Sequence, residues 1–192
     1  MIKRIIVTGH LGFIASAFCE AFHDQYEITG IDFGGWGSMG RNLMPGVRDV
    51  RVDIADADAV RKIVDDVHPD AIVNFAAESH VDRSNEDDTA FWRSNVFGAR
   101  NLALQAGRLG IRMVQVSTDE VYGALELDEE RLFTEQTPIM PNMPYAAAKA
   151  GGDLMCNAYW VTHKVPVVVT HCSNNYGPYQ FPEKLIPFFV FK

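Results

Sequence analysis

The feature that most constrains the fold is an apolar run that leads directly into a glycine turn. The run, Ile2–Thr8, is short and rich in β-branched residues, as is typical of a buried parallel strand. The turn has the pattern G-x-x-G-x-x-A at Gly9, Gly12 and Ala15, and a helix is expected over Phe13–His23. A strand that passes through a tight turn into a helix begins a β-α-β unit, so the α/β class is indicated.

The alternation of strand and helix continues along the chain. Further strands are expected over Glu27–Asp32, Val47–Val52, Ala71–Phe75, Arg112–Ser117 and Val165–His171. Helices are expected over Asp56–Val67, Thr89–Leu109 and Tyr145–His163, with irregular loops over Phe33–Gly46 and Leu125–Pro144. This alternation predicts one doubly wound parallel sheet with helices on both faces.

A cofactor site is predicted where the first strand meets the glycine turn. Gly9 permits the tight turn, and Gly12 lets backbone N–H groups approach a pyrophosphate at the positive end of the helix. Ala15 replaces the third glycine, at a position that serves helix–strand packing. Asp32 ends the second strand, 20 residues after Gly12, where a carboxylate binds the adenosine ribose hydroxyls. The combination predicts a Rossmann-type domain that binds NAD rather than NADP, and an α/β turn without a ligand is the alternative.

Two further strand ends are candidates for cofactor contacts. Asp53 and Ile54 follow the third strand, where Asp53 can contact the adenine or can cap the next helix. Phe75, Ala76 and Ala77 end the fourth strand, and the small residues let the backbone lie close to the cofactor at the carboxyl edge of the sheet.

Candidate catalytic residues are expected at the same edge. Thr118, Asp119 and Glu120 follow the fifth strand, Tyr145 opens a helix after a proline-rich loop, and Lys149 shares its helix face. The Lys149 ammonium can lower the pKa of Tyr145 and turn the phenol into a base. Asp119 and Glu120 repel each other, so one is expected to stay protonated near neutral pH and act as acid while the other acts as base. A solvated turn and an ordinary helix surface are the structural alternatives.

Composition and charge disfavour several other classes. A net charge of -8 argues against nonspecific nucleic-acid binding, and no apolar run reaches the roughly 18 residues of a membrane span. The N-terminal residues enter a strand without the apolar region of a signal peptide. Cys19, Cys156 and Cys172 are far apart, and neither they nor the histidines have metal-ligand spacing. We therefore expect reduced, mostly buried thiols, no metal site and a cytoplasmic protein.

Four long motifs carry a resemblance to a known family. They are Ala76–Ser84, Ser117–Gly123, Tyr145–Ala150 and Cys172–Pro187. Over nearly its whole length the chain resembles the extended short-chain dehydrogenase/reductase family and, within it, the dTDP-glucose 4,6-dehydratases. Related sugar-nucleotide epimerases and decarboxylases generally lack the Asp-Glu pair after the threonine, and GDP-mannose dehydratases carry a different residue at the aspartate.

The resemblance implies 4,6-dehydration of a nucleotide-activated hexose, with NAD regenerated in each turnover. It implies that Tyr145 takes the C4 hydroxyl proton while Thr118 hydrogen-bonds the C4 oxygen. Glu120 would take the C5 proton, and Asp119 would protonate the departing C6 hydroxyl. The residues implied at the substrate are Ser79, Thr118, Asn174, Lys184 and Leu185. Those implied or predicted around the cofactor are Gly9, Gly12, Phe13, Ile14, Asp32, Asp53, Ile54, Phe75, Ala76, Ala77, Ser94, Ser117, Tyr145, Lys149 and Asn175.

The chain departs from this family in three places. Ala15 stands where a glycine is usual, and the loop Phe33–Gly37 differs from the usual sequence after the acid. Almost all of the C-terminal part that binds the nucleotide base and diphosphate is missing. We therefore expect residues 1–181 to form an NAD-binding domain with the catalytic residues, and residues 182–192 to begin a truncated substrate-binding segment. Pro182 and Glu183 indicate a helix start there, and its apolar run is expected to pack against another surface.

Two other readings remain open. One is a related sugar-nucleotide epimerase or decarboxylase, and the other is a truncated NAD-binding domain that turns over little. The resemblance also implies a homodimer formed through the helices Thr89–Leu109 and Tyr145–His163.

Overall fold

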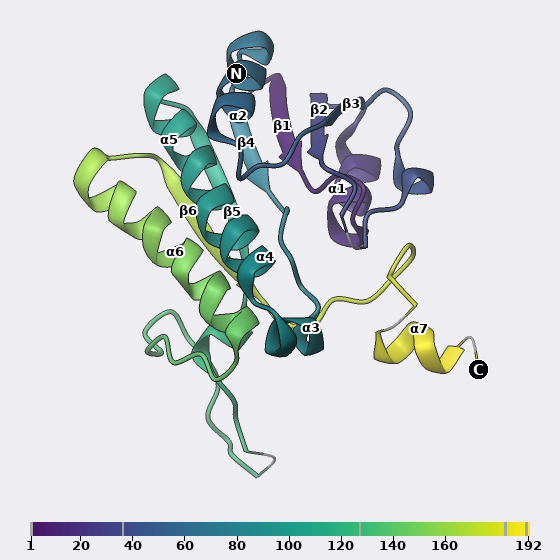
Figure 1. Cartoon of the computed structure of the whole chain (residues 1–192), viewed down its shortest axis with the longest axis vertical. Coiled ribbons are helices and arrows are strands. Elements are labelled where there is room, and N and C mark those ends of the chain that lie inside the picture. The colour runs from purple at the N-terminus through teal and green to yellow at the C-terminus, as the bar shows by residue number, and fades with distance from the viewer. Residues whose placement is uncertain (1, 36, 127, 183, 191) are drawn as a thin grey trace.

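The computed structural model of the chain describes residues 2–35, 37–126, 128–182, 184–190 and 192. Its described strands form one parallel sheet in the order β3-β2-β1-β4-β5-β6 (Figure 1). The strands are β1 (Arg4–Thr8), β2 (Glu27–Asp32), β3 (Arg48–Arg51), β4 (Ala71–Asn74), β5 (Arg112–Thr118) and β6 (Val167–Cys172). The order reverses between β1 and β4, and the predicted doubly wound parallel sheet is confirmed.

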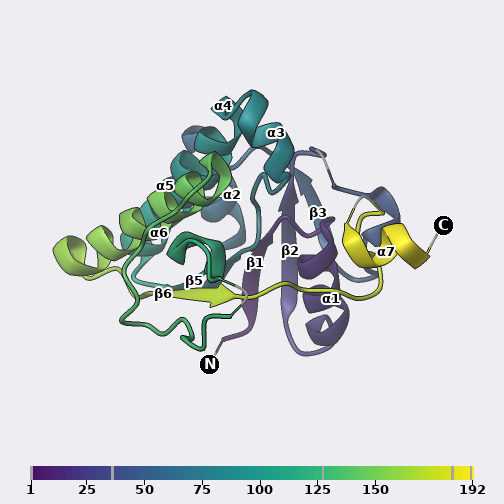
Figure 2. The same cartoon turned by 90° about the horizontal axis from the view of Figure 1, so that it is seen from below.

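Helices cover both faces of the sheet, but unequally. One face carries α1 (Phe13–Phe22), and the other carries α2 (Ala57–Val67), α5 (Ala99–Leu109) and α6 (Pro144–His163), as Figure 2 shows. The core under α1 includes Val7, Ala15 and Cys19. The larger core under the three helices is centred on residues such as Ile72 and Leu102, which are fully buried. Strands β1, β2 and β4 are therefore packed on both faces, whereas Val168 on β6 is 60% exposed.

Helix α2 shows how local sequence sets an element. Asp56 caps its first turn, because its carboxylate accepts the backbone N–H groups of Asp58 and Ala59. The helix ends at Val67, where His68 adopts a left-handed conformation with φ of 48°. Its buried residues are Val60, Ile63, Val64 and Val67, which recur at helical spacing.

The region between β4 and α5 differs from the prediction in one element. A short helix, α3 (Val81–Glu86), was not expected from the sequence. It begins at His80, whose Nδ1 accepts the backbone N–H of Arg83 at 3.4 Å. A polar six-residue helix has too few apolar positions to show a helical period, so the sequence pattern could not reveal it.

The predicted helix Thr89–Leu109 is helical throughout but not uniform. It consists of α4 (Thr89–Phe91), a π-helical stretch η2 (Trp92–Gly98) and α5. Helix α6 lies against this stretch so closely that a Cβ on Gly152 would collide with the carbonyl oxygen of Asn95. π-helical turns often accompany functional sites, and this one borders the cleft described below.

Three short helices complete the described elements: η1 (Gly40–Asn42), η3 (Asp119–Tyr122) and α7 (Leu185–Val190). The predicted helix near the C-terminus is present as α7, although residue 183 of its expected start lies outside the described residues. The expected packing of its apolar run is not seen, since Leu185 is 72% exposed and Phe189 is 67% exposed. Figure 1 shows α7 standing beside the sheet rather than on it.

Three further points about the described residues concern membrane spans, metal sites and the cysteines. No described helix combines the length and the apolar character that crossing a membrane requires. The described residues hold no cluster of three or more side chains that could bind a metal. Cys19 and Cys156 are buried, Cys172 is half-buried, and all three are free thiols.

Candidate active site

A cleft of about 340 Å³ opens at the carboxyl edge of the sheet, where the strand order reverses. The glycine turn after β1 forms one wall, and the ends of β2, β4 and β5 continue it. The beginning of α6 and the segment after β6 form the opposite wall. Ligands of doubly wound sheets bind at this position, because loops from both halves diverge there.

The glycine turn is shaped by two requirements that meet at Gly9. Gly9 has a φ of 71°, a backbone conformation that residues with a side chain rarely adopt. A Cβ at this position would also lie 2.9 Å from the backbone of Ala76. Gly12 follows as the N-cap of α1, and no side chain caps this helix. The backbone N–H groups of its first turn are therefore left for an anion at the positive end of the helix dipole.

Asp32 is held at the cleft by hydrogen bonds from three neighbours. Its carboxylate accepts the backbone N–H groups of Leu11 at 3.3 Å and Gly34 at 2.8 Å. The hydroxyl of Ser38 also donates to it, at 2.7 Å. Ser38 lines the cleft and was missed from the sequence, since a serine in a glycine-rich loop carries no signal of its partner.

His10, inside the glycine turn, has a packing role that the sequence did not indicate. Its ring is buried and fills the space above Gly30, where a Cβ would collide with it. Its Nε2 lies 3.0 Å from the Asp49 carboxylate on β3. The ring thus ties the turn to β2 and β3 and makes glycine necessary at position 30.

Tyr145 and Lys149 lie together at the start of α6, and both line the cleft. The Lys149 ammonium donates a hydrogen bond to the carbonyl oxygen of Val116 at 2.7 Å. The backbone N–H of Tyr145 donates to the Ser84 hydroxyl at 3.2 Å, and its ring packs edge-on against Phe91. These contacts anchor the pair to β5, α3 and α4, so its position does not depend on α6 alone.

The predicted effect of Lys149 on Tyr145 is not what the structure shows. The pKa of Tyr145 is raised above its usual value, first by burial and then by the charge of Glu120. The pKa of Lys149 is lowered by burial, and the Asp153 carboxylate opposes this shift. The prediction considered spacing only, whereas desolvation of both groups decides the direction.

Glu120 and Asp119 differ in their environments although they are neighbours. The pKa of Glu120 is raised, first by burial and then by the charge of Asp119, while Lys184 acts in the opposite sense. Glu120 lines the cleft and Asp119 does not. The Thr118 hydroxyl contacts both residues. It accepts the backbone N–H of Glu120 at 3.3 Å and donates to the Asp119 carboxylate at 3.4 Å.

Most of the predicted site residues meet in this cleft. Those lining it are Gly9, Gly12, Phe13, Ile14, Asp32, Ile54, Phe75, Ala76, Ala77, Ser79, Ser94, Ser117, Thr118, Glu120, Tyr145, Lys149, Asn174, Asn175 and Lys184. Asp119, Asp53 and Leu185 are not brought to its lining. Asp53 accepts the N–H of Ala55 and pairs with Arg93 at 3.0 Å, whereas the next helix is capped by Asp56. Leu185 lies on the exposed helix α7.

Glu78 is a cleft residue that was not singled out from the sequence. It is buried, and burial raises the pKa of its carboxyl group. The Asn95 side chain accepts its backbone N–H at 2.9 Å and donates to its carbonyl oxygen at 3.0 Å. The available signal was its place directly after Phe75, Ala76 and Ala77, which were predicted to lie close to the cofactor.

Comparison with known proteins places this geometry in a wider group. Residues 5–192 match the model of the NAD dependent epimerase/dehydratase family. The dTDP-glucose 4,6-dehydratase of Streptomyces niveus is 47% identical, over 97% of this chain and 58% of that protein. The dTDP-glucose 4,6-dehydratase of Mycobacterium tuberculosis is 40% identical, over 96% of this chain and 57% of that protein.

Solved structures agree in fold. DesIV, a dTDP-glucose 4,6-dehydratase of Streptomyces venezuelae solved with NAD bound, superposes with a TM-score of 0.90 at 44% identity, covering 98% of this chain and 61% of that one. The UDP-glucose 4-epimerase of Thermus thermophilus, solved in complex with NAD, gives 0.86 at 30% identity, covering 94% and 58%. The chain thus spans about three fifths of the length of these relatives. With its matched family model, its sheet order and its glycine-turn cleft, the chain belongs to the NAD dependent epimerase/dehydratase family.

Proposed function

We propose that this chain binds NAD and carries the catalytic residues of a dTDP-glucose 4,6-dehydratase. The observation that carries the proposal is that one cleft holds two kinds of group. The glycine turn and Asp32 lie at one end, and Thr118, Glu120, Tyr145 and Lys149 lie at the other. The similarity to dehydratases from Streptomyces and Mycobacterium supports this choice of substrate.

The residues present fit a dinucleotide. The uncapped first turn of α1 can receive the pyrophosphate, and Gly9 keeps the turn close to Ala76. Asp32, already oriented by Ser38 and Gly34, has the place and charge to accept the adenosine ribose hydroxyls. When bound, NAD supplies a hydride acceptor for C4 of the sugar and later a hydride donor for C6.

The first chemical task of the protein is to remove the C4 hydroxyl proton. Tyr145 takes this proton, and Thr118 hydrogen-bonds the oxygen that becomes the ketone. Because burial raises the pKa of Tyr145, its phenolate needs positive charge nearby, and Lys149 on the same helix face provides it. The resulting 4-keto group makes the C5–H bond acidic.

The second task is to remove water across C5 and C6. Glu120 takes the C5 proton, and its raised pKa makes it a stronger base than an exposed glutamate. Asp119 does not line the cleft, but its carboxylate lies 3.4 Å from the Thr118 hydroxyl, which does; from this position it donates a proton to the C6 hydroxyl, which leaves as water. An epimerase or decarboxylase needs no such carboxylate pair, so Asp119 and Glu120 favour the dehydratase over those relatives.

The direct test is incubation of the purified chain with NAD+ and dTDP-glucose, followed by mass spectrometry and proton NMR. Loss of one water with a new C6 methyl signal is the expected result. A product of unchanged mass with inverted C4 would instead identify an epimerase. Bound NAD without any product would favour the second candidate, a domain that binds NAD and turns over little.

We also infer that the chain forms a homodimer through η2 and α6. Large apolar side chains on these helices are exposed, including Phe97 at 57% and Trp160 at 51%. The helical segment Thr89–Leu109, which contains η2, and helix α6 are both long and carry exposed apolar residues. Such helices can form a bundle with their counterparts in a second copy. Light scattering after size-exclusion chromatography at micromolar concentration should give twice the chain mass. Trp160→Arg should shift it to the monomer, and a wild-type monomer would contradict the inference.

A further inference from the structure

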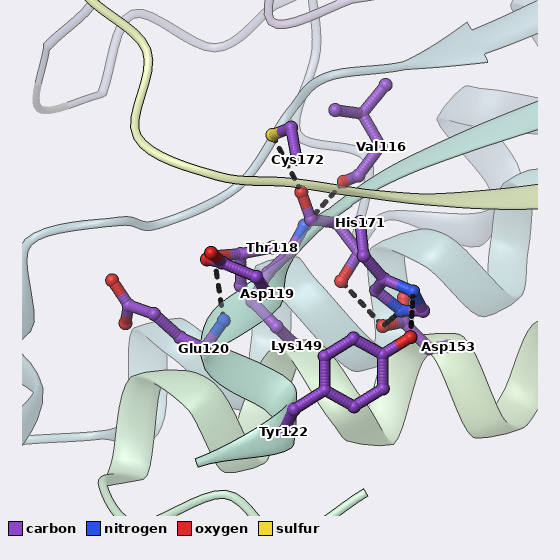
Figure 3. Close-up of polar contacts among 10 residues, drawn as sticks. Val116, Thr118, Asp119, Glu120, Tyr122, Lys149, Asp153, His171 and Cys172 are labelled. Atoms are coloured by element: carbon purple, nitrogen blue, oxygen red, sulfur yellow. Dashed lines mark hydrogen bonds and ion pairs between the residues drawn. The ribbon is translucent and has the colours of Figure 1, made fainter. Parts of the chain in front are cut away.

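A row of polar side chains begins at Ser117, which lines the cleft, and continues through Asp153, His171 and Tyr122, which do not; the row takes no part in the mechanism above. The Ser117 hydroxyl donates to the Asp153 carboxylate at 2.5 Å, and Nε2 of His171 lies 3.2 Å from the same oxygen. Nδ1 of His171 lies 2.8 Å from the Tyr122 hydroxyl. Figure 3 shows Tyr122, Asp153 and His171, which come from η3, α6 and β6, close to one another with Lys149 nearby.

The contacts define where the protons lie when His171 is neutral. Nε2–H donates to the Asp153 carboxylate, and Nδ1 accepts the Tyr122 O–H. Asp153 then accepts from His171 and from Ser117 at one oxygen, which suits an ionised carboxylate. Its other oxygen, Oδ1, is buried and has no hydrogen-bond partner among the described residues. An anion in this position requires a positive charge nearby.

Lys149 is the matching cation. Asp153 lies one turn after Lys149 on α6, and each residue is only 4% exposed. The hydrogen bond of Lys149 to Val116 involves a neutral carbonyl and does not balance its charge. Burial lowers the pKa of Lys149, and Asp153 is the first of the groups that raise it. The two buried charges therefore compensate each other.

Other titratable groups surround the pair from each neighbouring element. They are Asp119, Glu120 and Tyr122 on η3, Glu135 in the following loop, Tyr145 and Cys156 on α6, and His171 and Cys172 on β6. Of the groups that raise the pKa of Lys149, the two besides Asp153 are the thiols of Cys172 and Cys156. Asp153 is thus the one carboxylate among the groups that raise the pKa of Lys149.

We propose that Asp153, held by His171 and Ser117, is a positioning residue that keeps Lys149 charged while Tyr145 takes the sugar proton. His171 fixes which way the carboxylate faces, and Tyr122 fixes the tautomer of His171. This inference rests on the proposed roles of Tyr145 and Lys149.

The test is a direct titration of Lys149 in the purified chain, independent of turnover. Lysine labelled with ¹³C at Cε is incorporated, and the Cε chemical shifts are followed against pH. The other lysines, Lys3, Lys62, Lys164, Lys184 and Lys192, are exposed or half-buried, and Lys149→Arg identifies the Lys149 signal by its loss. Asp153→Asn should move the Lys149 midpoint to lower pH. An unchanged midpoint would overturn the proposal.

Further variants separate positioning from simple loss of structure. His171→Leu should shift the Lys149 midpoint in the same direction but less, and His171→Gln, whose amide N–H can replace Nε2–H, should restore it. An unchanged midpoint in His171→Leu would remove His171 from the role. Asp66→Asn removes a carboxylate whose partner is Arg48 on the surface, and should leave Lys149 unaffected. If Asp153→Asn does not fold, the two His171 variants still decide the question.

A kinetic readout distinguishes this inference from the proposed function. In Asp153→Asn, the alkaline limb of C4 oxidation should move to lower pH, because Lys149 loses its proton earlier. At the wild-type optimum oxidation should be about tenfold slower or more, with KM for NAD unchanged. An inactive wild-type chain whose Lys149 midpoint still shifts in Asp153→Asn would contradict the function and retain the inference. An active wild-type chain whose Lys149 midpoint does not shift in Asp153→Asn would support the function and contradict the inference.

Discussion

The two halves of the sheet build their parts of the cleft by different means. In the half made by β1, β2 and β3, the cleft wall consists of glycine backbone and apolar side chains such as Phe13 and Ile14, with the carboxylate of Asp32 held by three neighbours. In the half made by β4, β5 and β6, titratable groups line the cleft, of which Glu78, Tyr145 and Lys149 are buried and Glu120 is half-buried.

This difference predicts different responses to change. In the first half the shape of the backbone matters most. The glycine turn has a positive φ at Gly9 and lies against the backbone of Ala76, just after β4. In the second half the charges of the groups matter most. Burial shifts the pKa of each group, and neighbouring charges add to that shift or oppose it. Substitutions in the first half should alter cofactor binding at any pH. Those in the second half should alter reaction steps, with an effect that varies with pH.

The largest effect is expected at Tyr145. Tyr145→Phe keeps the ring against Phe91 but removes the hydroxyl that takes the C4 proton. Oxidation, measured as NADH formed in a single turnover, should fall by about 100-fold or more, while NAD affinity measured by calorimetry stays the same. Tyr159→Phe, the same change later in α6, should leave oxidation intact. Normal oxidation in Tyr145→Phe would remove this residue from the role.

Glu120→Gln should separate the two chemical steps. C4 oxidation should continue slowly and NADH should accumulate, whereas water loss, measured by mass spectrometry, should stop. In the wild type, water loss should fall as pH drops through the Glu120 pKa, because the base must be ionised. Since that pKa is raised, the fall should begin at higher pH than for an ordinary glutamate. Glu130→Gln, at an exposed glutamate, is the control, and unimpaired dehydration in Glu120→Gln would refute the assignment.

Gly9→Ala tests the half that works by shape. The added Cβ meets the Ala76 backbone at 2.9 Å and requires an unfavourable φ, so unfolding free energy should fall by about 1–3 kcal/mol. NAD binding should weaken at every pH. Gly46→Ala also has positive φ, at 81°, but no atom lies within 4 Å of its added Cβ. Equal loss of NAD affinity in both variants would contradict the role of close approach at Gly9.

Ser38→Ala should have the smallest effect. It removes one hydrogen bond to Asp32, whereas the N–H groups of Leu11 and Gly34 still orient the carboxylate. A loss of about 1 kcal/mol corresponds to roughly fivefold weaker NAD binding, measurable by calorimetry. A larger effect would mean that Ser38 itself contacts the cofactor.

Local patterns allowed most of the fold to be predicted. Most strands were recognised because a buried parallel strand is a short apolar run, although ends differed by one or two residues, as at β1 (Arg4–Thr8). The helix Thr89–Leu109 was correct in extent, but its π-helical part, where Asn95 lies close to Gly152, was not predicted. Such an approach depends on residues far apart in the chain and leaves no trace in local periodicity.

The candidate site divides in the same way. By itself the sequence determined the parallel sheet, the glycine turn, Asp32 at a strand end, and Tyr145 and Lys149 on one helix face, because short spacings encode these features. Only the tertiary structure decided that His10 packs on Gly30, that Asp153 meets His171, and that burial raises the pKa of Tyr145. Packing and desolvation depend on how distant segments surround a group, and that is settled only when the chain folds.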